Sequence, residues 1–161
     1  MYASSIDLPD NVRSSSIALL NARLADAINL AAQLKYAHWN VHGPHFMALH
    51  LLFDALHDEV DGYADLLAER VAAFGGTAEG TLQQAVSATT LMPYPTEANT
   101  EHVHLEALGR SLAAFAGKAR AAIQDTTDAG DLGTADIFTE ISRAADKALW
   151  KVEAHFRPKR A

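Results

Sequence analysis

The sequence predicts an all-α protein built around one bundle of four long helices. Apolar residues recur at spacings of three and four along four long segments, which is typical of helices that bury one face. No segment alternates apolar and polar residues as a half-exposed strand does. The 161 residues, 49% of them hydrophobic, fit a single domain over residues 1–161.

The first helix is predicted over residues 11–40, with its start capped by Asp10 or by a serine within 14–16. It is expected to end at Gly43-Pro44, because proline disfavours helical geometry in the residue before it. The apolar face of this helix comprises Ile17, Leu20, Leu24, Ile28, Ala31, Leu34 and Val41.

A second helix is predicted over residues 44–74, where Gly75-Gly76 stops it. A long crossover follows over 77–96, in which TLQQAVSA favours a short helix and MPYPT cannot continue one. The apolar face of the second helix comprises Phe46, Leu49, Phe53, Leu56, Val60, Leu67, Val71 and Phe74.

The last two helices are predicted over residues 96–125 and 134–156, separated by the turn TTDAGDLG. The chain thus has two short helix connections and one long one. A four-helix bundle with a single long crossover is the ferritin-like arrangement, so the expected fold is a ferritin-like bundle with a short extra helix in the crossover.

Composition excludes several classes of protein. The absence of cysteine rules out disulfides and thiolate metal sites, so any metal must be held by His, Asp and Glu. We find no signal peptide and no membrane-length apolar run, and we therefore expect a cytoplasmic protein with no membrane partner. A net charge of −7 disfavours nucleic acid, although Arg157, Lys159 and Arg160 make the tail at 157–161 basic. A short tail is also expected at 1–10.

Four residues of the second helix share one face. At about 100° per residue, His50, Asp54, Asp65 and Glu69 fall at roughly 0°, 40°, 60° and 100°. Asp54 and Asp65, however, lie roughly 16 Å apart along the axis, too far for one metal ion with ligand distances of ~2 Å. A single subunit therefore cannot complete a metal site from this face.

A two-fold dimer can complete it. An axis near Glu59 and Val60 would place His50 and Asp54 of one chain opposite Asp65 and Glu69 of the other, which gives two identical sites. His38, near the end of the first helix, can add a second imidazole. Mixed imidazole and carboxylate ligation suits iron, manganese or zinc, and open positions suit redox chemistry of Fe(II).

Two alternatives stand beside this hypothesis. A buried histidine is more often a hydrogen-bonded core residue, and an acidic helix face is usually only solvated; a simple helical interaction module would look the same. A metal site inside one bundle would need carboxylates and Glu-x-x-His motifs from the other helices. Only Glu101 to His104 matches that motif, and the first helix offers only Asp26.

These residues resemble the Dps family, the DNA-protection mini-ferritins of starved bacterial cells. The similar pattern starts at His38-Trp39-Asn40-Val41, Gly43 and Phe46. It continues through His50, Asp54 and Asp65 to Ala68-Glu69-Arg70 and Gly75-Gly76. Weaker similarity, including Tyr94-Pro95 and the last helix, extends over nearly the whole chain.

The resemblance implies a ferroxidase centre shared by two subunits, with His38, His50 and Asp54 from one and Asp65 and Glu69 from the other. It also implies a hollow homododecamer that oxidises Fe(II), typically with hydrogen peroxide, and stores ferric mineral. Trp39 looks like the family's aromatic that intercepts oxidising equivalents, the alternative being a core residue. Asp131, Asp136 and Asp128 resemble pore acids, or else turn and helix-capping residues.

DNA binding is the family function that this sequence supports least. Residues 1–12 contain no Lys or Arg, unlike the lysine-rich tails of the best-known binders. Arg157, Lys159 and Arg160, repeated in an oligomer, could still contact phosphates, which leaves a nucleoid-binding protein with little ferroxidase activity as the alternative function. We expect His42 and His45 to serve the turn and His57 to lie near the two-fold axis.

Overall fold

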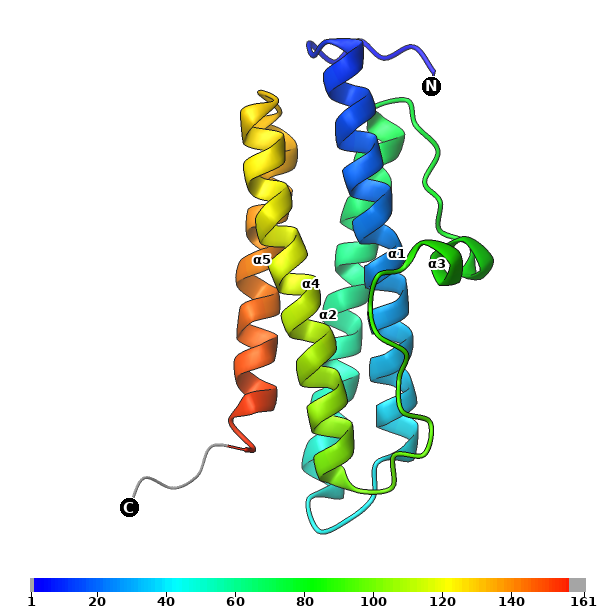
Figure 1. Cartoon of the computed structure of the whole chain (residues 1–161), viewed down its shortest axis with the longest axis vertical. Coiled ribbons are helices and arrows are strands. Elements are labelled where there is room, and N and C mark those ends of the chain that lie inside the picture. The colour runs from blue at the N-terminus through cyan, green and yellow to red at the C-terminus, as the bar shows by residue number, and fades with distance from the viewer. Residues whose placement is uncertain (1, 157–161) are drawn as a thin grey trace.

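The computed structural model describes residues 2–156, and helices are the only regular secondary structure there (Figure 1). The predicted all-α, ferritin-like bundle with a short crossover helix is therefore confirmed. In chain order the helices are α1 (Asp10–Asn40), α2 (Phe46–Ala73), α3 (Leu82–Ala88), α4 (Glu101–Asp128) and α5 (Leu132–Glu153).

The bundle consists of two helical hairpins packed side by side. Helix α1 packs along α2 and α4 packs along α5, while α1 also contacts α4 and α2 contacts α5 (Figure 1). The predicted apolar faces meet between the hairpins, where Phe53, Phe74, Phe115 and Phe138 are fully buried. Each such ring stabilises the fold by about 1.5–3 kcal/mol relative to exposure. Phe46 departs from the prediction, since it begins α2 at the bundle end and stays partly exposed.

Side-chain caps decide where α4 and α5 begin, whereas the cap predicted for α1 is absent. Helix α1 begins after Pro9, and neither Asp10 nor the serines at 14–16 cap it. Helix α4 begins only at Glu101, because the Thr100 hydroxyl accepts a hydrogen bond from the Val103 amide. Helix α5 begins earlier than expected, since Asp131 caps it.

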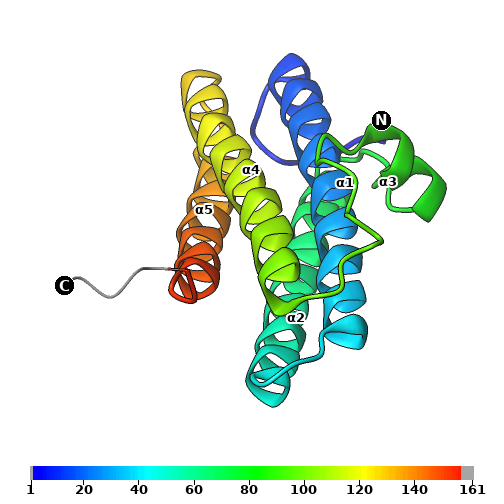
Figure 2. The ribbon, with the colours of Figure 1, turned by 60° about the horizontal axis from the view of Figure 1, so that its bottom comes forward.

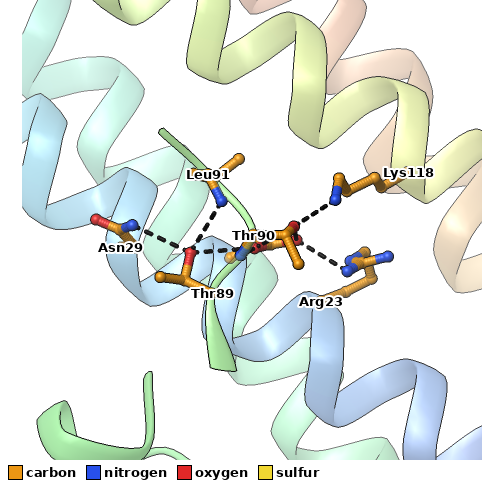
Figure 3. A network of polar contacts seen from close by, with 7 residues as sticks. Arg23, Asn29, Thr89, Thr90, Leu91 and Lys118 are labelled. Carbon is orange, nitrogen blue, oxygen red and sulfur yellow. Dashed lines mark hydrogen bonds and ion pairs between the residues drawn. The ribbon is translucent and has the colours of Figure 1, made fainter. Parts of the chain in front are cut away.

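The crossover is tied to the outside of the bundle, with α3 standing beside α1 (Figures 1 and 2). Its anchor is Asp26, whose buried carboxylate pairs with Arg23 at 2.9 Å. The same carboxylate accepts hydrogen bonds from Thr89 and from the amide and hydroxyl of Thr90. Figure 3 shows this network, which Asn29 and Lys118 extend. Asp26 is therefore fully engaged in holding the crossover.

Candidate metal centre

His38 and His50 lie face to face where α1 ends and α2 begins. Their rings stack with centroids 3.7 Å apart and planes 21° from parallel. The Nδ1 atom of His38 lies 2.8 Å from the carbonyl oxygen of His50, and Nδ1 of His50 lies 2.9 Å from the carbonyl oxygen of His38. The short turn through Gly43, where φ is +136°, brings the two helices together in this way.

These reciprocal hydrogen bonds fix the chemistry of both rings. A carbonyl oxygen only accepts, so each Nδ1 must carry the hydrogen and donate it. In a neutral imidazole the other nitrogen, Nε2, then keeps its lone pair. Backbone acceptors commonly orient metal-binding histidines in this way. Both rings therefore have the tautomer that a metal ligand needs.

Asp54 lies one turn after His50, beside the two rings. Its Oδ1 is 3.7 Å from Nδ1 of His38 and accepts a hydrogen bond from Lys35. This hydrogen bond lowers the pKa of the Asp54 carboxyl, against the opposing effect of burial. The carboxylate is thus ionised and half-exposed. We call His38, His50 and Asp54 the histidine half of the site.

Sequence reasoning missed Lys35. It lies three residues before His38, so helical spacing alone places it on the same side of α1. Its ammonium group forms an ion pair with one oxygen of Asp54 and so offsets the charge of that carboxylate.

Asp65 and Glu69, which we call the acidic half, lie farther along α2 and are exposed. Neither side chain forms a hydrogen bond or ion pair in the part of the chain that the structure describes. Residues 2–156 of one chain hold no group of three or more ligand-type side chains able to bind a metal. Within one subunit the two halves therefore stay apart, as the eleven-residue separation of Asp54 and Asp65 requires.

The face of α2 that carries both halves is open in the single chain. Its N-terminal part is apolar, with Met47 and Leu51 each 59% exposed. Its C-terminal part forms one wall of a groove against α1, lined by Leu24, Ile28, Asp58, Asp61, Gly62, Ala64, Asp65, Ala68 and Gly80. An exposed apolar stretch continuous with a groove is typical of a protein interface.

The residues of the alternative intrachain site are engaged elsewhere. Glu101 accepts hydrogen bonds from the amide and from Nδ1 of His45, at 2.6 and 2.9 Å, and so holds the turn before α2. His104 contacts Tyr94, and Asp26 anchors the crossover. His45 thus has the predicted turn role, while His42 is exposed beside it.

Two of the predicted roles need correction. Trp39 is 68% exposed, so within a subunit it is not a core residue. Asp131 is 1% exposed and accepts hydrogen bonds from Ser16, from Arg70 and from the Thr134 amide, so it serves as the α5 cap and cannot line a pore. Asp128 and Asp136 are exposed, and the pore role stays a prediction for them.

The basic residues Arg157, Lys159 and Arg160 lie outside the described residues, as does the whole predicted C-terminal tail at 157–161. Among residues 2–156, no helix is long and apolar enough to cross a membrane.

Comparison with known proteins assigns the family. The model of the ferritin-like domain matches residues 17–160. A DNA protection during starvation protein of Agrobacterium fabrum is 48% identical over 153 residues, which cover 95% of this chain and 94% of that protein. A second DNA protection during starvation protein, from Mycolicibacterium smegmatis, is 33% identical over 148 residues, which cover 92% of this chain and 80% of that protein.

Solved structures agree. A Dps from Mycobacterium smegmatis superposes with a TM-score of 0.93 at 31% identity, covering 99% of this chain and 96% of that one. DpsC from Streptomyces coelicolor superposes with a TM-score of 0.94 at 28% identity, covering 99% of this chain and 94% of that one. The chain therefore belongs to the Dps family of ferritin-like proteins.

Proposed function

We propose that this chain is an iron-storage and detoxification protein. In this proposal it oxidises Fe(II) with hydrogen peroxide at sites shared by two subunits, and a hollow homododecamer holds the ferric product. The observation that carries the proposal is the stacked pair His38 and His50, whose Nδ1 atoms are both engaged and whose Nε2 atoms are left to bind metal. His50 shares its face of α2 with Asp65 and Glu69, whose side chains have no partner in the described part of the chain.

The register of α2 against a second copy supports a shared site. An axis between Glu59 and Val60 pairs residues whose numbers add to 119, so His50 faces Glu69 and Asp54 faces Asp65. The same register sets Met47 against Ala72 and Leu51 against Ala68. Large exposed side chains thus meet small ones, which close helix packing requires.

The donor set fits iron. Two neutral imidazoles and three carboxylates per site combine the nitrogen and oxygen ligands that iron, manganese and zinc accept. Iron is the substrate here: two Fe(II) ions each lose one electron, and peroxide takes up both electrons and two protons to become two water molecules. Because the electrons are taken in a pair, no hydroxyl radical is released, which is how such a site would protect DNA.

The chain's own residues have distinct tasks in this site. The stacked rings of His38 and His50 hold two lone pairs at a fixed separation before metal arrives. Asp54 exchanges the ammonium group of Lys35 for a metal ion, so charge in the site stays balanced. The acidic half, exposed and unpaired, supplies the remaining negative charge from the neighbouring subunit.

Half-site complementation tests the shared site. One variant carries His50→Ala with Asp54→Asn, and the other carries Asp65→Asn with Glu69→Gln. Each alone should lose peroxide-dependent Fe(II) oxidation, measured as ferric absorbance. Co-refolded in equal amounts they should regain about a quarter of the wild-type rate, because half of the dimers are mixed and each mixed dimer has one intact site. No recovery in the mixture, or full activity of either variant alone, would overturn the proposal.

Direct DNA binding is a second candidate function, because the 48% identical relative is named a DNA protection during starvation protein. Arg157, Lys159 and Arg160 are the residues we assign to it, with a nucleoid-binding protein as the alternative function. Replacing all three by Gln should abolish a gel shift at low salt and leave Fe(II) oxidation unchanged. A shift that persists in this variant would show that other residues bind DNA.

A further inference from the structure

Tyr94 and His104 form a hydrogen-bonded pair that the iron site does not use. Tyr94 lies in the crossover just before α4, and His104 lies in the first turn of α4. The Oη atom of Tyr94 is 2.7 Å from Nδ1 of His104. The imidazole is 0% exposed, and its Nε2 has no hydrogen-bond partner among the described residues.

The direction of this hydrogen bond follows from the available partners. With the hydrogen on Nδ1, both the hydroxyl hydrogen of Tyr94 and the lone pair of Nε2 would lack a partner in the described chain, whereas with the hydrogen on Nε2 only that one N–H lacks a partner. Tyr94 is therefore the donor, and His104 carries its single hydrogen on Nε2. Burial, with a smaller effect from His42, lowers the pKa of His104, while the Asn40 carbonyl opposes this. The imidazole is thus neutral and Nδ1 is a free base.

Burial has the opposite consequence for the phenol. It raises the pKa of Tyr94, so the hydroxyl stays protonated at rest. Loss of one electron from a phenol makes its hydroxyl strongly acidic. A base already in hydrogen-bond contact then receives the proton without rearrangement. Tyr94 is therefore placed to become a neutral radical.

Tyr36 connects this pair to the iron-binding helix. Its ring lies edge-on to that of Tyr94, with centroids 5.2 Å apart. It is two residues before His38, roughly 3 Å along the axis of α1. Its hydroxyl donates to the backbone carbonyl of Thr96 at 2.9 Å. A carbonyl cannot hold the proton, so oxidised Tyr36 has no stable product and draws an electron from Tyr94.

We propose that Tyr94 and His104 form a proton-coupled redox pair that traps single oxidising equivalents inside the protein. A hydroxyl radical takes one electron from Tyr94, directly or through Tyr36, and becomes hydroxide. The Oη–H bond breaks, and the proton forms a new bond to Nδ1 of His104. A later one-electron reductant, such as Fe(II), restores the phenol with the returning proton. Only the source of the radical rests on the proposed function: a hydroxyl radical forms when a single Fe(II) ion reduces peroxide by one electron, outside the paired reaction.

A second tyrosine provides a matched comparison. Tyr63 is buried and donates to a carboxylate oxygen of Glu59 at 2.8 Å. A carboxylate is a weaker base than an imidazole by about two pKa units in ordinary solution. Tyr63 should therefore hold a radical less well than Tyr94, and Tyr2, which is 79% exposed, should hold none.

The pair can be tested without iron. Azide radicals, generated by pulse radiolysis in the metal-free protein, oxidise tryptophans, of which Trp39 and Trp150 are exposed in the single chain. The expected end product is a long-lived phenoxyl absorbance and tyrosyl spin signal, absent in Tyr94→Phe and unchanged in Tyr63→Phe and Tyr2→Phe. A signal that survives in Tyr94→Phe, or is lost in Tyr63→Phe, would overturn the proposal.

His104→Gln keeps a hydrogen-bond acceptor but cannot take the proton. Phenoxyl formation in this variant should be roughly 100-fold slower than in the wild type, which is the lower end of what a positioned base contributes. The wild-type rate should fall in D₂O, because a proton moves in the step, whereas the rate of the variant should not change in D₂O. An unchanged rate in His104→Gln would count against proton transfer even if Tyr94 is oxidised. The His50→Ala, Asp54→Asn variant should retain the signal, so loss of Fe(II) oxidation and loss of the redox pair are separate results.

Discussion

At the scale of residues, the two histidines owe their tautomer to the backbone of the opposite helix. Each ring is held by the carbonyl of the other residue, so the lone pairs are fixed by the same contact that joins α1 to α2. The two rings are therefore already oriented, so a metal ion bound at the proposed site would cost these rings little conformational entropy.

Lys35 is expected to compete with metal for Asp54. Because this pair is about one-third exposed, water screens it and breaking it costs little free energy. Lys35→Gln should therefore bind Zn(II), a redox-inactive probe, about 1.5- to fivefold more tightly by calorimetry. Lys147→Gln, far along α5, serves as the charge-matched control. Weaker binding in Lys35→Gln would show instead that Lys35 positions the carboxylate.

At the scale of elements, Asp131 joins three helices. Its carboxylate caps α5, accepts from Ser16 of α1 at 2.6 Å and pairs with Arg70 of α2 at 3.1 Å. Gly133 leaves room for the guanidinium, since a Cβ there would lie 2.7 Å from it. This junction holds the end of the bundle opposite the histidine half.

Asp131→Ala should destabilise the fold by about 2–4 kcal/mol, because it removes a cap and leaves two partners unpaired. Asp136→Ala, an exposed neighbour, should change the free energy of unfolding by less than about 0.5 kcal/mol. Denaturant unfolding measures both. Full stability with slower iron uptake in Asp131→Ala would restore the pore role.

The same junction should depend on pH. Although burial opposes it, hydrogen bonds from Ser16 and Thr134 and the charge of Arg70 lower the pKa of Asp131 below 3.8. A lowered carboxyl pKa contributes stability that is complete above that ordinary value and lost as pH falls below it. The wild type should therefore lose more stability than Asp131→Asn on acidification below about pH 4. Equal losses of stability in the wild type and in Asp131→Asn would show that the ionised Asp131 carboxylate does not stabilise the junction.

At the scale of the whole molecule, the proposed assembly needs the open face of α2. Leu51 lies on that face within the same arc as Glu69, and the proposed register sets it on Ala68. A carboxylate there would be buried without a partner.

Leu51→Glu should dissociate the two-fold dimer and abolish Fe(II) oxidation together, whereas Leu51→Met, of similar volume, should preserve both. Native mass spectrometry and the ferric absorbance assay give the two readouts. A dissociated Leu51→Glu variant that still oxidises Fe(II) at the wild-type rate would show that one subunit suffices.

Periodicity was enough to predict the helices and the crossover, because burial of one face depends on spacing along the chain. Helix ends were less predictable, since caps such as Thr100 and Asp131 act through a few hydrogen bonds. The tautomers of His38 and His50, and the contact between Tyr94 and His104, depend on tertiary proximity that spacing does not encode.

The length of α2 sets a distance within the proposed dimer. One centre lies around residue 52 of a chain and the other around residue 67, so roughly 22 Å of helix separates them. In the proposed assembly, this length of helix sets the spacing between the two sites of Fe(II) oxidation. One residue inserted near Val60 would rotate the acidic half by about 100° about the helix axis relative to the histidine half, and so disrupt both shared sites. Deletions and insertions here should therefore be tolerated far less than substitutions.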